Sequence, residues 1–145
     1  MFSTLRTEKP AKEAAAAISK AVLEHNVACA REGVQMATQA KDAKSAIAAA
    51  EHVVDAVARI MNVAANKVGI DTLKRATAAA TTAEELADIV YTAKLIAAVT
   101  YSAAAEALDA AAAAEEAKAA AKAAESSLRR RKGYSRLECR VAAEH

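Results

Sequence analysis

The longest uninterrupted helical pattern in the chain is TTAEELADIVYTAKLIAAVTYSAAAEALDAAAAAEEAKAAAKAAESSLRRRK, residues 81–132. It contains no glycine and no proline. Thr82 with Glu85, or Thr81 with Glu84 one step earlier, forms a capping-box pattern that starts a helix. Alanine, the strongest helix former, fills most of the stretch from Ala103 to Ala124. We therefore predict one C-terminal helix of about 50 residues, roughly 75 Å long.

Shorter helices are predicted before it. The first runs from Pro10, which suits a first helical turn, to about Ala40. The second begins after Asp42, a good N-cap, and stops at Gly69, and a short third helix covers residues 71–80. Apolar residues of the second helix recur at spacings of three and four, which indicates a seam facing another helix. They are Ile47, Ala50, Val54, Val57, Met61, Ala64 and Val68.

These elements predict an all-α fold, an antiparallel alanine-rich helix bundle of four to five helices with a long C-terminal helix. The first two helices would reach only roughly 40 to 45 Å, so the C-terminal helix should overhang them unless it kinks near Ser102. Gly133 is expected to end that helix. We accordingly predict a bundle domain at residues 1–132 and a basic C-terminal tail at residues 133–145.

The composition predicts a thin core. Alanine provides 45 of the 145 residues, although 54% of the chain is hydrophobic. An alanine methyl group hides far less area than a leucine side chain, so each burial contributes little. Self-association would add buried surface. Three glycines, one proline and no tryptophan leave little from which to build sheets or aromatic pockets.

Charge and cysteine content indicate a soluble cytoplasmic protein. The formal net charge is only +2, and the stretch from Met1 to Pro10 lacks the apolar segment of a secretory signal. The longest uncharged stretch, Leu95 to Ala105, is well short of the roughly 20 residues that span a bilayer, so we expect no transmembrane segment. Cys29 and Cys139 lie far apart in the chain and fit a reducing compartment.

Two side-chain pairs could carry chemistry. His25 and Cys29, four residues apart, could act as base and nucleophile or share a metal. His52 and Asp55, beside Glu51, could orient an imidazole for proton transfer. Such pairs are common on ordinary helices; the first pair has no evident third group, and the second has no evident pocket. We therefore expect neither to be catalytic.

No cofactor or metal is expected. The Glu-x-x-His spacing of two-metal helix bundles is missing, because Val22 and Ala49 stand three residues before His25 and His52. The three glycines are isolated, so no glycine-rich loop can cradle a phosphate.

A basic cluster stands near the C-terminus. Such a cluster can neutralise phosphates, but cations at a helix C-terminus also complement the helix dipole. The candidate anion-binding residues are Arg129, Arg130, Arg131, Lys132, Arg136 and Arg140.

The sequence therefore favours a non-enzymatic protein–protein interaction or structural protein that self-associates or binds another protein through its helix faces. The second helix and the alanine-rich half of the C-terminal helix would carry the contact, with Val54, Val57, Met61, Ala107, Leu108 and Ala114 as candidates. The alternative is an anion-binding protein that uses its basic C-terminal arm on nucleic acid or a membrane surface.

Overall fold

The structure, a computed structural model, describes the backbone of residues 18–144 and the side chains of residues 18–130. Within this range the chain forms helices and no strand. The prediction of an all-α protein is confirmed, with four described helices rather than four to five. They are α2 (Lys20–Gln39), α3 (Ala43–Ala58), α4 (Ala64–Ala79) and α5 (Ala83–Glu144).

Helix α2 begins later than the sequence indicates. Ser19 is extended, and its side-chain oxygen accepts a hydrogen bond from the backbone N–H of Val22 at 3.3 Å. This serine cap satisfies a free N–H at the helix start. An unbroken helix from Pro10 to Ala40 is therefore wrong at residues 18–19. The predicted start at Pro10 lies outside the described residues.

Helix α3 begins where predicted and ends earlier. The carboxylate of Asp42 caps it by accepting from the backbone N–H of Ser45 at 2.7 Å. The helix stops at Ala58 rather than Gly69. In the following turn, the Asn62 side chain accepts from the N–H of Ala64 at 3.0 Å and so helps to start the next helix.

Two predictions about the region of helix α4 are therefore wrong. Gly69 lies inside it and is not a helix end, and the short helix predicted at residues 71–80 is its second half. An isolated glycine weakens a helix by only about 1 kcal/mol relative to alanine, which tertiary packing can offset.

The start of α5 confirms the predicted pairing of Thr82 with Glu85, with the Glu85 carboxylate bonded to Thr81 rather than to Thr82. The hydroxyl of Thr82 accepts from the N–H of Glu85, and the Glu85 carboxylate accepts from the N–H of Thr81, each at 3.2 Å. The helix is unbroken through Ser102 and continues past Gly133 to Glu144. The expectation that Gly133 ends the helix is wrong, because no second stop signal accompanies this single glycine.

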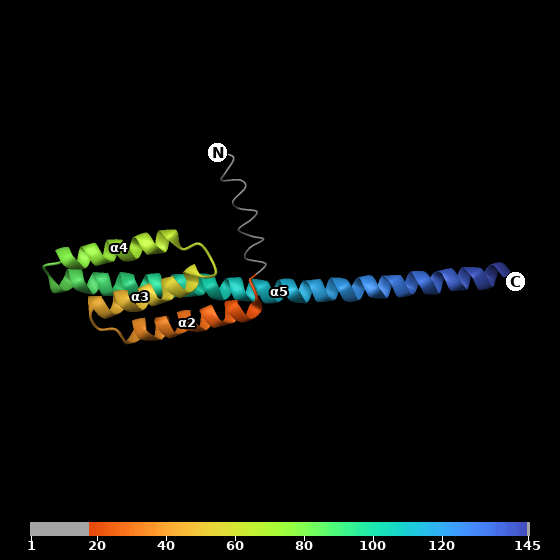
Figure 1. Cartoon of the computed structure of the whole chain (residues 1–145), viewed down its shortest axis with the longest axis horizontal. Helices are drawn as coiled ribbons and strands as arrows, with labels where there is room; N and C mark the ends of the chain where they lie inside the picture. The colour runs from red at the N-terminus through yellow and green to blue at the C-terminus, as the bar shows by residue number, and fades with distance from the viewer. Residues whose placement is uncertain (1–17, 145) are drawn as a thin grey trace, which may run out of the picture. The chain divides into compact units, whose positions relative to one another are not determined.

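The chain divides into two compact units, Met1–Asp109 and Ala110–His145. The described part of the first unit contains α2, α3, α4 and the beginning of α5, which lie alongside one another in Figure 1. The remainder of α5 forms the second unit. A domain boundary after Lys132 stays a prediction.

The core of the first unit centres on α3. Val53, Val54 and Val57 of this helix are at most 1% exposed. Helix α3 contacts both α2 and α4. On α5 a narrow buried stripe faces the same core, and its members recur every three or four residues: Ile89, Ala93, Ala97, Thr100 and Ala104. Small residues dominate this stripe, which permits close approach of the helices.

Candidate interaction surface

The second unit presents an uncovered helix face of small residues. Every side chain from Ala113 to Arg130 is exposed. From Ala110 onward, positions spaced alternately by four and three residues carry alanine and finally leucine. Because this spacing keeps residues on one side of a helix, they define a continuous stripe. We call it the alanine face: Ala110, Ala114, Ala117, Ala121, Ala124 and Leu128.

The first unit also exposes apolar side chains on α5. Tyr91, Leu95 and Val99 are 70%, 50% and 58% exposed. Their spacing of four residues places them on one helix face, on the side of α5 away from its buried stripe. Asp88 and Glu106 lie near the two ends of this face.

The predicted interaction residues fall into three groups. Val54 and Val57 are 1% and 0% exposed and pack inside the first unit, so little of either side chain is left for a partner. Met61 is half-buried in the turn after α3, and Ala107 and Leu108 are half-buried on α5. Ala114 is exposed and belongs to the alanine face.

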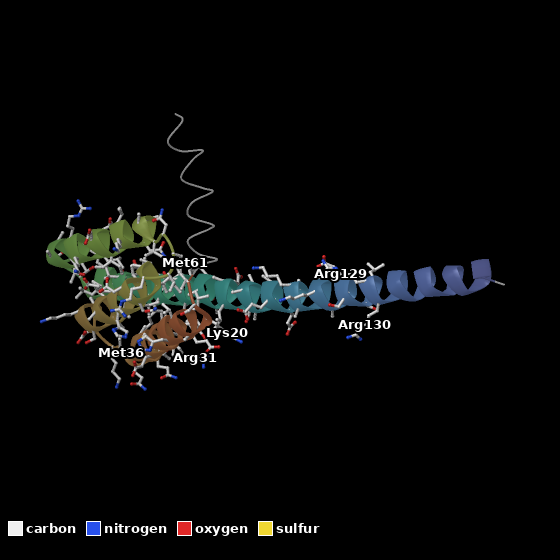
Figure 2. All side chains as sticks on the ribbon, turned by 45° about the vertical axis from the view of Figure 1, so that its right-hand side comes forward. Lys20, Arg31, Met36, Met61, Arg129 and Arg130 are labelled. Carbon is white, nitrogen blue, oxygen red and sulfur yellow. The ribbon has the colours of Figure 1, made fainter. Side chains whose placement is uncertain are left out.

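The basic cluster lies on helical backbone throughout. Arg129 and Arg130 are exposed and appear as labelled sticks on α5 in Figure 2. The guanidinium of Arg129 is 3.4 Å from the carboxylate of Glu125, one turn earlier. The side chains of the other candidates lie outside the described range: Arg131, Lys132, Arg136 and Arg140.

His25 and Cys29 do meet on α2. The cysteine Sγ lies 3.7 Å from Nε2 of the histidine; His25 is exposed and Cys29 is half-buried. Among the described side chains, no group of three or more His, Cys, Asp or Glu residues is placed to hold a metal ion. The pair therefore has the geometry of a weak local hydrogen bond on a helix surface.

His52 and Asp55 are both exposed on α3. The neighbouring Glu51 points elsewhere, because its carboxylate forms an ion pair with the ammonium of Lys74 on α4 at 3.0 Å. The hydrogen bond from Lys74 to Glu51 raises the pKa of Lys74. The third group proposed beside His52 is thus engaged in linking α3 to α4.

An open groove of about 370 Å³ lies between α3 and α4. Its floor is formed by apolar surface and its rim carries the ion pair just described. The lining residues are Lys44, Ile47, Ala48, Glu51, Lys74 and Thr77. The charged residues of the groove are two lysines and one carboxylate that is already paired. This set is more typical of a solvent-exposed contact between two helices than of an active site.

Polar contacts inside the first unit connect the helices. Asn66 on α4 donates to the hydroxyl of Thr100 on α5 at 2.6 Å, and Thr100 is fully buried. Asn26 on α2 accepts from Arg59 at 3.4 Å. Asn66 stands out in the sequence as a polar residue in an apolar helix, whereas nothing in the sequence marked Thr100 as its partner or Asn26 as the partner of Arg59.

One segment of α5, within Ala83–Arg130, is long and apolar enough to cross a membrane by length and composition, and 17% of its apolar window is buried. Core helices pass the same test, so the expectation of no transmembrane segment stays a prediction.

Comparison with protein-family models, curated proteins and solved structures found no match.

Proposed function

We propose that this chain is a non-enzymatic interaction protein that self-associates through α5, with an antiparallel helix bundle as its scaffold. The observation that carries the proposal is the alanine face, whose six side chains are all exposed. A cytoplasmic location and the lack of a cofactor belong to the same proposal.

Cross-helix contacts support an antiparallel bundle. Asn26 of α2 bonds to Arg59 just past α3, while Gly33, further along α2, approaches Val53, earlier in α3. The same reversal relates α4 to α5, since Asn66 meets Thr100 and Gly69 approaches Ile96. In both pairs, advancing along one helix means going back along the other.

The energetics of isolated helices support self-association. Helices in proteins gain most of their stability from packing an apolar face, because propensity alone is marginal in water. The described side chains of α5 beyond Ala113 have no such burial. A partner on the alanine face would supply this burial. Small side chains also let two helices pack with an interaxial distance at the lower end of the usual range of roughly 8–10 Å.

Two matched double variants test this proposal. Ala117→Glu with Ala124→Glu places two charges on the alanine face, whereas Ala119→Glu with Ser126→Glu places them on the opposite side at the same spacing and at positions that are also exposed. Sedimentation velocity should show that the first variant is monomeric and the second associates like the wild type. Equal association of both variants would contradict a contact on this face.

The basic cluster favours anion binding as a second candidate function. Six basic residues lie between Arg129 and Arg140, and the first two are exposed. Phosphate contacts made by such residues weaken steeply with salt. Arg130→Gln with Arg131→Gln should reduce retention on a DNA column at low salt more than the matched change Lys118→Gln with Lys122→Gln. A wild-type chain that flows through at low salt would exclude this candidate.

A further inference from the structure

The sequence of the alanine face and its flanks indicates which partner it fits. We propose that it is the same segment of a second copy, docked antiparallel so that Ala121 of each chain lies opposite Ala124 of the other. This inference rests on the proposed self-association and adds the occupant, orientation and register. It concerns the second unit alone, from Ala110 onward.

The alanine face has the spacing of a two-helix seam. Its members alternate by four and three residues from Ala110 to Leu128, which is the repeat of helices that wind around each other. Five of the six are alanine, so neither helix presents a bulky obstacle along this length. A second helix can therefore approach along the whole face.

The large residue of the face fits the proposed register. Leu128, 57% exposed, is the sixth member of the alanine face. In the antiparallel alignment it lies opposite Ala117 of the second copy, so that a large side chain meets a small one at both ends of the seam. A parallel alignment in register would instead set Leu128 against Leu128 and leave only alanine against alanine elsewhere.

Charge determines the orientation. Lys118 and Glu125 directly follow two members of the alanine face, Ala117 and Ala124, so both lie on the same flank of that face, and both are exposed. In an antiparallel pair this flank of one helix adjoins the same flank of the other, so the proposed alignment brings Lys118 beside Glu125 of the second copy. The two-fold symmetry repeats this pair at the other end of the seam.

A parallel pair would have the opposite electrostatics. Residues 129–132 are all basic, so a parallel alignment would place two such runs side by side. Like charges at this distance disfavour association. The ion pair between Arg129 and Glu125 does not prevent the antiparallel contact, because its side chains are 80% and 66% exposed and free to exchange partners.

The exposed face of the first unit lacks this self-complementarity. Tyr91, Leu95 and Val99 are flanked at both ends by acid, with Asp88 before them and Glu106 after them. An antiparallel copy would bring these two carboxylates together. The charge pattern therefore selects the alanine face, rather than this one, for a second copy.

Disulfide trapping tests the orientation. In full-length chains carrying Cys29→Ser and Cys139→Ser, we would prepare Ala117→Cys and Leu128→Cys separately and oxidise each alone and as a mixture. The antiparallel alignment predicts cross-linking in the mixture. It predicts none for Ala117→Cys alone, because the two copies of residue 117 would be about 16 Å apart along the axis, beyond the reach of a disulfide.

Light scattering on the same unoxidised samples separates the two proposals. Dimers that cross-link through Ala117→Cys alone, or that do not cross-link in the mixture, would overturn the antiparallel alignment and leave self-association standing. Monomers at every concentration would overturn self-association itself. Dimers with a cross-link confined to the mixture would support both.

Discussion

At the scale of single residues, Gly33 shows how closely two helices can approach when a side chain is missing. A Cβ atom at this position would lie 2.5 Å from Cγ2 and 3.1 Å from the backbone nitrogen of Val53 on α3. The valine is fully buried and its backbone cannot give way easily. The glycine in α2 thus has a packing reason that outweighs its low helix propensity.

Gly33→Ala should therefore lower the free energy of unfolding. Overpacking costs typically about 1–3 kcal/mol, against a propensity gain of about 1 kcal/mol, so the expected net change is a loss of up to about 2 kcal/mol. The change in unfolding free energy is measured by urea denaturation monitored by circular dichroism.

Gly69→Ala is the matched control. A Cβ there would meet only the terminal Cδ1 of Ile96, at 3.3 Å, and that methyl can shift. We expect an unchanged or raised unfolding free energy, by up to about 1 kcal/mol. A gain in both variants would contradict the close packing of α2 on α3.

At the scale of helices, caps were predictable and interior breaks were not. Asp42 and the pair of Thr82 with Glu85 could be identified because a cap is a local pattern of side chain and backbone N–H. The break after Ala58 is different. In the sequence its apolar spacing continues through Met61, Ala64 and Val68, whereas the residues buried at the turn are Ile60 and Val63, which that spacing does not select.

The Asp42 cap has a predictable pH dependence. Hydrogen bonds from the side chain and backbone of Ser45 lower the pKa of Asp42 from its ordinary 3.8. A carboxyl whose pKa is lower in the folded protein stabilises it above the unfolded pKa, and this contribution is lost as the pH falls through the folded value.

Asp42→Ala should accordingly lower the urea midpoint at pH 7, and the difference from wild type should narrow below about pH 3.8. Asp42→Asn is the control, since asparagine caps as well as aspartate but does not titrate. The difference in urea midpoint between Asp42→Asn and Asp42→Ala should stay constant with pH. If the difference in urea midpoint between wild type and Asp42→Ala did not change from pH 7 to pH 3, a role for the carboxylate would be refuted.

At the scale of the whole molecule, composition predicted the all-α class, because alanine-rich segments without glycine or proline have few alternatives to helix. The contact residues were harder to predict. Val54 and Val57 have the spacing of a helix seam, but spacing alone does not tell whether the facing helix belongs to the same chain, and both side chains are buried within it. Ala114 lies where no described element covers it.

Self-association through α5 is the central claim, and the solution mass of the full-length protein tests it most directly. Light scattering across a concentration range should give twice the chain mass of 15.0 kDa at high concentration, falling toward the single-chain value on dilution. A mass of 15.0 kDa at every concentration would contradict the claim and direct attention to foreign partners and to the basic cluster.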